Sequence, residues 1–181
     1  MNAIRTIGHS NHPLERFVGL LKTGGVALLV DVRSMPYSRR FPQFDKARLA
    51  KSLADSGIAY LWEGAALGGK PKDGGSYETL AARPDFKDAL ARVIERGTGT
   101  TLCLMCAEKE PLECHRTMLV SRRLAERGVA VEHLLADGTV RPHVEIEEAL
   151  LKKSGGADLF ADRATRLAQA YRARERAMKG S

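Results

Sequence analysis

Five short apolar segments alternate with amphipathic segments along most of the chain, and this alternation constrains the fold more than any other feature. Each apolar segment has the length of a buried β-strand, and we predict strands at residues 3–8, 27–33, 58–62, 100–106 and 129–135. The intervening segments carry apolar residues at helical spacing and predict helices at residues 13–25, 45–57, 85–97 and 117–128. Strands that alternate with helices form βαβ units. We therefore expect an α/β fold: a single domain with a mostly parallel, five-stranded sheet and helices on both faces.

The pattern changes after residue 143. A short helix is predicted at residues 144–153, and a basic helix or frayed tail at 158–178. We therefore divide the chain into an α/β domain, residues 1–143, and a basic helical C-terminal extension, residues 144–181. The whole chain has 29 lysines and arginines against 22 aspartates and glutamates, a net charge of +7. This excess favours anionic partners such as phosphorylated metabolites or nucleic acid, although a solvated basic surface gives the same composition.

Composition also bears on the compartment. No run of about 18 apolar residues is present, so no membrane partner is expected. The N-terminal sequence MNAIRTIGHS lacks a basic start followed by an apolar block, which is the pattern of a secretory signal. Three cysteines make an odd number, few for a disulfide framework. We therefore expect reduced thiols in a cytoplasmic protein. Nothing in the sequence specifies an oligomeric state.

Polar residues follow the carboxyl end of each predicted strand. In an open parallel sheet, ligands bind outside these ends, near the point where the strand order reverses. Polar loops are also common without a site, because loops lie at the surface. If the fold is right, one rim of the sheet gathers the following residues: His9, Ser10, Asp31, Arg33, Ser34, Glu63, Cys106, Glu108 and Asp137.

The sequence CAEKEPLECHR follows the fourth predicted strand. Cys106 ends that strand, whereas Cys114 lies near the start of the next helix, where unpaired N–H groups and the helix dipole favour a thiolate. A neighbouring Arg116 or protonated His115 would lower the pKa of Cys114 further. Cys114 is therefore the candidate nucleophile or redox thiol. His9 is the candidate acid or base, because His115 would point about 100° away from Cys114 on a helix.

Other interpretations of this stretch remain open. Cys106, Cys114 and a histidine could bind zinc, but their spacing is not the short C-x(2–4)-C of common structural sites, and we predict no cofactor. Arg33, Arg116 and backbone N–H groups could bind a phosphate or carboxylate, with the sulfurs as bystanders. The cysteines could also be buried and inert, as is expected of Cys103 within the strand. A cysteine-phosphatase loop, C-x5-R, is excluded because neither Cys106 nor Cys114 is followed by an arginine at the required position.

Two loops suggest chemistry of other kinds. Residues 35–44, MPYSRRFPQF, interleave Arg39 and Arg40 with aromatic residues, an arrangement that suits stacked bases and phosphates but also an ordinary ordered loop. Residues 63–84 form a long, glycine-rich connection that could close over a ligand or be merely flexible. No G-x-x-x-x-G-K-[ST] motif is present and no G-x-G-x-x-G motif follows the first strand, which argues against a nucleotide P-loop and a dinucleotide cofactor.

In combination, these segments resemble the bacterial and archaeal family named domain of unknown function 488. The resemblance rests on TIGHSN, VDVRSMPYSRRFPQF, WEGAALGG and LCLMCAEKEPLECHR, and it covers roughly residues 4–143. Lys70 stands where relatives often carry arginine. The resemblance implies an α/β domain with a polar site, and it supplies no reaction, substrate or cofactor. The residues that match the family pattern are Gly8, His9, Ser10, Asp31, Arg33, Pro36, Ser38, Phe41, Leu67, Gly68, Gly69, Cys106, Glu108, Cys114, His115 and Arg116.

We therefore hypothesise an enzyme that acts on an anionic or phosphate-bearing substrate at the carboxyl edge of the sheet. Cys106 would be a resolving thiol or a wall of the pocket, and Glu108 would orient a histidine or arginine. The alternative is a nucleic-acid-binding or nucleic-acid-processing module with structural cysteines, and a third hypothesis is a non-catalytic interaction module. The candidate catalytic residues are Cys114, His9, Cys106 and Glu108, and the candidate substrate-binding residues are Arg33, Arg116, Ser10, His115 and Arg39.

Overall fold

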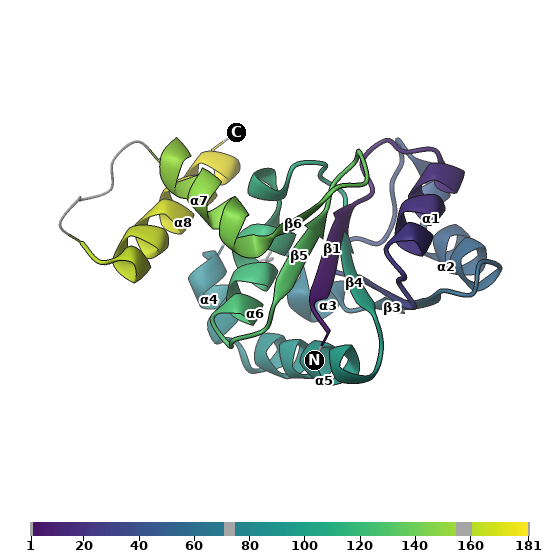
Figure 1. The fold of residues 1–181 in the computed structure, drawn as a ribbon, viewed down its shortest axis with the longest axis horizontal. Coiled ribbons are helices and arrows are strands. Elements are labelled where there is room, and N and C mark those ends of the chain that lie inside the picture. Colours follow the sequence, from purple (N-terminus) through teal and green to yellow (C-terminus); the bar gives the residue numbers. More distant parts are fainter. Residues whose placement is uncertain (1, 71–74, 155–160, 181) are drawn as a thin grey trace.

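The computed structural model describes residues 2–70, 75–154 and 161–180, and its centre is a six-stranded sheet (Figure 1). The strands are β1 (Ile4–Gly8), β2 (Leu28–Asp31), β3 (Ala59–Trp62), β4 (Leu102–Cys106), β5 (Val131–Leu134) and β6 (Val140–Pro142). Their order is β3-β2-β4-β1-β5-β6. Strands β1 to β5 pair in parallel, and β6 pairs antiparallel with β5. The predicted α/β fold with a mostly parallel sheet is confirmed, and the sheet has one strand more than the five predicted.

Strand β6 was not predicted because it lacks the pattern of a buried strand. Its three residues are all exposed, and the last is a proline. The tight turn before it returns the chain beside β5: Gly138 has a φ of +91°, and a carboxylate oxygen of Asp137 accepts the backbone N–H of Thr139 at 2.9 Å. Proline is tolerated in β6 because the strand lies at the edge of the sheet.

The helices lie in the connections between the strands and at the C-terminus. They are α1 (Leu14–Thr23), α2 (Lys46–Ala54), α3 (Gly64–Leu67), α4 (Tyr77–Ala82), α5 (Pro84–Gly99), α6 (Arg122–Ala125), α7 (His143–Lys153) and α8 (Arg163–Lys179), with 3₁₀ turns at Pro42–Phe44 and Pro111–Glu113. A π-helical segment, Arg116–Ser121, leads directly into α6. The glycine-rich connection 63–84 contains α3 and α4, and its residues 71–74 lie outside the described residues.

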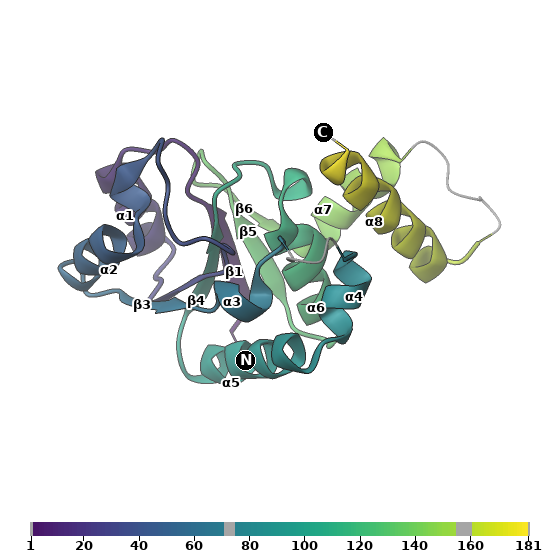
Figure 2. The same ribbon diagram turned by 180° about the vertical axis from the view of Figure 1, so that it is seen from behind.

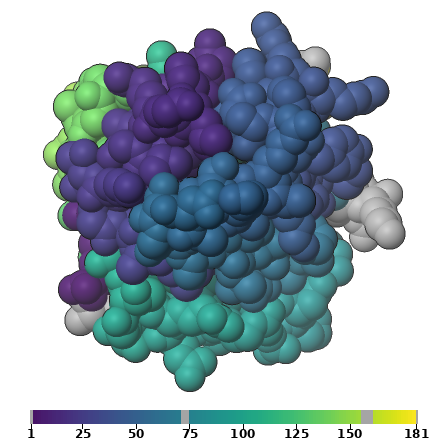
Figure 3. All heavy atoms as spheres, turned by 90° about the vertical axis from the view of Figure 1, so that its right-hand side faces the viewer, coloured from purple at the N-terminus to yellow at the C-terminus, as the bar shows by residue number. Residues whose placement is uncertain are grey.

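Helices cover both faces of the sheet, as predicted. Helices α1 and α2 pack on one face, where Phe17 and Leu49 belong to one buried apolar cluster. Figure 3 shows this side of the molecule, with the purple and blue segments of the N-terminal third above the teal of α5. Helices α5 and α6 pack on the opposite face, where Phe86 and Leu124 belong to a second cluster. The sheet is therefore the middle of three layers.

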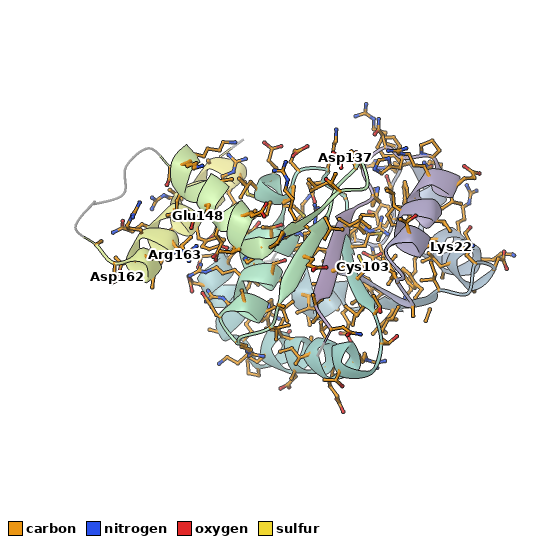
Figure 4. The ribbon with its side chains drawn as sticks, in the orientation of Figure 1. Lys22, Cys103, Asp137, Glu148, Asp162 and Arg163 are labelled. Carbon is orange, nitrogen blue, oxygen red and sulfur yellow. The ribbon has the colours of Figure 1, made fainter. Side chains whose placement is uncertain are left out.

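The predicted helical extension consists of α7 and α8, which lie side by side (Figure 2). Leu150 of α7 and Tyr171 of α8 are buried in the same apolar cluster as α5 and α6. At the start of α8, Arg163 donates to Glu148 of α7 at 2.8 Å, and Figure 4 labels both residues. Among the described residues, none of the helices combines the length and the apolar character that a bilayer crossing requires.

The connections between strands create a switch point between β1 and β4. The chain leaves β1 through α1 on one face and leaves β4 through α6 on the other. A crevice forms at the carboxyl ends of parallel strands where neighbouring connections diverge to opposite faces. Gly8 and Cys106, the last residues of β1 and β4, are paired in register. The crevice therefore opens beside the polar residues that follow these two strands.

Candidate functional site

Four side chains that follow β4 converge on one point. Cys106 Sγ and Cys114 Sγ each donate a hydrogen bond to the same Glu108 oxygen, Oε2, at 3.0 Å. His115 Nδ1 lies 3.4 Å from Cys106 Sγ. One ligand-type atom from each of the four residues lies within 4.8 Å of the other three. We call these four residues the thiol cluster.

The chain reverses between the two cysteines, and this reversal builds the thiol cluster. The 3₁₀ turn at Pro111–Glu113 ends with the Cys114 N–H donating to the Pro111 carbonyl at 3.2 Å. Cys114 then has an extended backbone, with φ −134° and ψ 137°, before the π-helical segment begins. His115 was predicted to point away from Cys114, as it would on a regular helix. This prediction is wrong, because the backbone at Cys114 is extended and His115 faces the cluster.

His115 is held in one orientation by the backbone of the loop after β2. Its Nε2 lies 2.9 Å from the carbonyl oxygen of Val32, which can only accept, so Nε2 carries the proton. Nδ1 is therefore the ring atom that faces the thiols. Gly69 packs directly against the ring, since a Cβ built on Gly69 would lie 2.4 Å from His115 Cγ. Only glycine fits at residue 69 without a shift of the imidazole.

The thiol cluster is braced by Arg116, whose side chain is 1% exposed. Its guanidinium donates to the backbone carbonyls of Glu108 at 2.5 Å and Lys109 at 3.1 Å. The backbone N–H of Arg116 also points at Cys114 Sγ, at 3.4 Å. A Cβ built on Gly8 would lie 1.9 Å from the Glu108 carbonyl oxygen, so glycine is required there for the loop to approach β1. Arg116 thus fixes the loop that carries Glu108.

The pKa values within the thiol cluster diverge. Burial alone would raise the pKa of Cys114, but the hydrogen bond from Cys106 and the positive charge of Arg116 bring it well below its ordinary value. The pKa of Cys106 is raised by burial and by the adjacent Cys114 thiolate. Glu108 is exposed as a residue, but its carboxyl group lies against the buried thiols, and this local desolvation, followed by Cys114, raises its pKa. Burial opposes charge on His115, yet contacts with Cys114 raise its pKa. The arrangement favours a thiolate at Cys114 and the protonated forms of its neighbours, and in that state the Glu108 carboxyl is the donor in the 3.0 Å contact with Cys114 Sγ.

A second group of polar residues lies across the crevice. Arg33 forms a buried ion pair with Asp31, with Nη2 and Oδ2 2.7 Å apart, and donates to the Phe44 carbonyl at 2.8 Å. Arg33 Nη1 lies 3.3 Å from His9 Nε2. His9 Nδ1 lies 2.8 Å from the Ser10 carbonyl and so donates to it, which leaves Nε2 to accept from Arg33. Burial and then the charge of Arg33 lower the pKa of His9 to about 4, so the ring is neutral at pH 7.

Two cavities meet at the thiol cluster. A cavity of about 210 Å³ separates the cluster from His9 and Arg33. A larger cavity of about 640 Å³ is bordered by Tyr77 and by α8. Lys70, Glu108 and His115 border both. The other residues that line the smaller cavity are Ser34, Met35, Tyr37, Ser38, Cys106 and Ala107, and α8 lines the larger cavity with Arg174, Ala177, Met178 and Lys179.

The structure brings most of the candidate residues together and separates a few. Cys106, Glu108, Cys114 and His115 form the thiol cluster, and His9 and Arg33 form the opposite wall of the smaller cavity. Arg116 is buried behind the loop and lines neither cavity. Ser10 has a φ of 49° and donates its hydroxyl to Asn11. Arg39 is exposed and also lines neither cavity.

Sequence reasoning missed two residues and placed a third correctly. Lys70 borders both cavities, and the one signal for it was the Leu-Gly-Gly that precedes it. Tyr60 on β3 donates its hydroxyl to Asp31 at 2.7 Å, and no motif marked it. Cys103 lies in the core on the opposite face of β4 from Cys106, as expected, where burial raises its pKa to about 12 (Figure 4).

Comparison with known proteins gives one result. A family model described as "Domain of unknown function DUF488" matches residues 13–123, a range that contains the whole thiol cluster. No curated protein matches the chain, and no solved structure matches it.

Proposed function

Since the chain belongs to the DUF488 family, whose description assigns no activity, we propose a function from the site itself: an enzyme that acts on a small anionic or phosphate-bearing substrate at the carboxyl edge of the sheet. The observation that carries this proposal is the smaller cavity, where positive side chains face titratable groups with displaced pKa values. Such displaced groups at a cavity are typical of reaction centres, because acid–base chemistry near pH 7 needs them.

Positive charge at this cavity favours an anion. Lys70 is exposed at its rim, and its backbone N–H donates to Ser34 Oγ at 3.1 Å, which ties the lysine to the loop after β2. Arg33 contributes a second charge, although Asp31 neutralises most of it. The hydroxyls of Ser34 and Ser38 line the same cavity. In this proposal Lys70 attracts and binds the anionic group, while Arg33 and the serines orient it.

The groups available for chemistry differ in their access to the cavity. Glu108 is exposed and borders both cavities, and its raised pKa means that it holds a proton more readily than an ordinary glutamate does. Cys106 lines the smaller cavity, whereas Cys114 lies behind it and lines neither cavity. A substrate would therefore meet Glu108, His115 and Cys106 first. We assign Cys114 the role of a buried thiolate that sets the charge of the cluster, and His9 that of a neutral acceptor on the opposite wall.

The proposal is tested by the binding of inorganic phosphate and pyrophosphate to the full chain, measured by calorimetry at low salt. Lys70→Ala should weaken binding about tenfold, or about 1.4 kcal/mol, because one charge of the anion site is removed. Lys22→Ala is the matched control, since Lys22 is an exposed lysine at the end of α1 and lines neither cavity. Equal affinities in the two variants would contradict the proposal.

The nucleic-acid alternative rests on the loop after β2. Met35 and Tyr37 are 54% and 52% exposed, and both lie on the rim of the smaller cavity. Arg39 and Arg40 follow on the same loop, exposed to solvent. Calorimetry with a single-stranded oligonucleotide distinguishes the two functions. The alternative would be favoured if oligonucleotide binding falls steeply with salt and is lost in the double variant Arg39→Ala/Arg40→Ala, while phosphate binding does not depend on Lys70.

A further inference from the structure

We propose that the thiol cluster is a zinc-binding site, in which Cys106 Sγ, Cys114 Sγ, His115 Nδ1 and a carboxylate oxygen of Glu108 are the four ligands. We further propose that Glu108 is the ligand that a water molecule or substrate displaces. The first statement stands on the cluster alone. The second rests on the proposed function.

The four atoms already lie close to the spacing of a tetrahedral site. Zinc bonds of about 2.3 Å to sulfur and about 2.1 Å to nitrogen or oxygen place neighbouring ligand atoms about 3.5 Å apart. The thiols lie 3.0 Å from Glu108 Oε2, and Cys106 Sγ lies 3.4 Å from His115 Nδ1. All four atoms fall within a 4.8 Å limit. No pair therefore exceeds the spacing of a tetrahedral site by more than about 1.3 Å, and movements of about 1 Å would complete the site.

Groups outside the cluster orient the ligands as metal sites require. A histidine ligand normally donates its second ring N–H to a carbonyl or carboxylate, and His115 Nε2 donates to the Val32 carbonyl at 2.9 Å. The backbone N–H of Arg116 points at Cys114 Sγ, which supports a thiolate. These contacts fix the ring tautomer and one sulfur before any ion binds. The 3₁₀ turn between the cysteines supplies the approach that a short C-x(2–4)-C spacing supplies elsewhere.

Charge balance also favours a divalent cation. Two thiolates and one carboxylate carry three negative charges, of which zinc would neutralise two. The guanidinium of Arg116, 1% exposed and bonded to the Glu108 carbonyl, lies beside the cluster to balance the third. A disulfide between Cys106 and Cys114 would use the sulfurs alone. It would remove both thiol donors from Glu108 and leave no use for the orientation of His115.

The difference in exposure among the ligands indicates a reactive site. Cys106 and Cys114 are buried, His115 is half-buried, and Glu108 alone is exposed. Glu108 also borders both cavities. Structural zinc sites are closed, whereas catalytic sites keep one exchangeable position. Displacement of Glu108 would open that position to an oxygen atom of the anionic substrate and leave a carboxylate beside it to accept a proton.

The test uses the full chain with any tag removed. We expect about one zinc per chain by elemental analysis, and cobalt substitution should give a thiolate-to-cobalt charge-transfer band together with the visible bands of tetrahedral cobalt. Cys114→Ser should lose the charge-transfer intensity of one sulfur. Glu108→Gln should keep that band and weaken zinc binding about tenfold, because an amide is a poorer ligand than a carboxylate.

The matched control is Cys103→Ala, which removes the remaining cysteine, in the same strand but on the opposite face of the sheet. Cys103→Ala should keep the full cobalt band. A chelator should lower the melting temperature of the wild-type protein and zinc should restore it, a readout that needs no variant.

The proposal is overturned if the reduced wild-type protein binds neither zinc nor cobalt, or if Cys103→Ala loses the band as fully as Cys114→Ser. Spontaneous formation of a Cys106–Cys114 disulfide, with no metal uptake after reduction, overturns it as well. Phosphate binding that depends on Lys70 in a metal-free protein would then still support the proposed function. Zinc binding without any phosphate binding would support the site and refute the function.

Discussion

Two glycines show how single residues shape the site. Gly8 allows the Glu108 carbonyl to approach β1, and Gly69 allows the backbone to lie against the His115 ring. Both belong to the segments that resemble the family pattern, so their presence there has a steric cause. The side chains of the thiol cluster depend on these close approaches as much as on their own chemistry.

Gly69→Ala should therefore destabilise the protein by about 1–3 kcal/mol, because the new methyl group overlaps the His115 ring. Gly19→Ala is the matched control: Gly19 lies inside α1, and a Cβ there would meet no described atom within 4 Å apart from its chain neighbours and the backbone of its own helix. That variant should gain about 0.5–1 kcal/mol from helix propensity. Free energies of unfolding from denaturant titration measure both, and a Gly69→Ala variant as stable as Gly19→Ala would refute the steric argument.

At the scale of elements, a buried chain of hydrogen bonds joins β1, β5, α7 and α8. Thr6 Oγ1 lies 2.8 Å from His133 Nδ1, His133 Nε2 lies 2.9 Å from His143 Nδ1, and His143 Nε2 lies 3.1 Å from the Tyr171 hydroxyl. Tyr171 donates in turn to Glu147 at 3.2 Å. One proton on each imidazole satisfies every link, with both rings neutral. The chain thus attaches the C-terminal helices to the sheet by polar as well as apolar contacts.

Tyr171→Phe removes the hydroxyl that ends this chain and should cost about 1 kcal/mol of unfolding free energy, since His143 loses a buried partner. Tyr37→Phe is the control, because Tyr37 is 52% exposed and no hydrogen bond of its hydroxyl is seen among the described residues. Hydrogen exchange at α8 should accelerate in Tyr171→Phe alone. Equal stability and equal exchange in the two variants would mean that the polar chain does not hold α8.

The elements themselves were predictable where burial dictates the pattern. Strands β2 and β4 are buried at every position, and their continuous apolar sequence correctly predicted them as buried strands. Strand β6 was not predicted because it is exposed, and helices α3 and α4 were not predicted because they lie among glycines. The residues at the carboxyl rim of the sheet could be predicted from the ends of the strands. The geometry of the thiol cluster could not be predicted, because it depends on the extended backbone at Cys114, which the local sequence does not encode.

At the scale of the whole molecule, buried histidines make stability depend on pH. Burial lowers the pKa of His143 to about 4, and burial together with the charge of Arg33 lowers that of His9 to about 4. Burial also lowers the pKa of His133 well below its ordinary value. Unfolded histidines take up a proton near pH 6.5. Between about pH 6.5 and 4 the unfolded chain therefore binds more protons than the folded protein. His115, whose pKa is raised, opposes this trend.

The free energy of unfolding should accordingly fall as the pH drops from about 7 to about 4, with His9 and His143 each contributing at most about 3 kcal/mol. His143→Gln should flatten this slope, because the substituted side chain does not titrate. Denaturant titrations at several pH values across this window measure the free energy of unfolding of the wild-type protein and of His143→Gln. A wild-type protein whose stability stays constant or rises as the solution is acidified would show that these rings are protonated in the fold.

Lys70, Glu108 and His115 border both the smaller and the larger cavity, and this shared boundary has a consequence for how ligands enter and leave the site. The same side chains can be reached from the loop after β2 and, separately, from the C-terminal helix. With two cavities at the same side chains, a substrate can enter through one cavity while a product leaves through the other. Such a two-sided layout would let an enzyme discharge one product fragment while retaining the other.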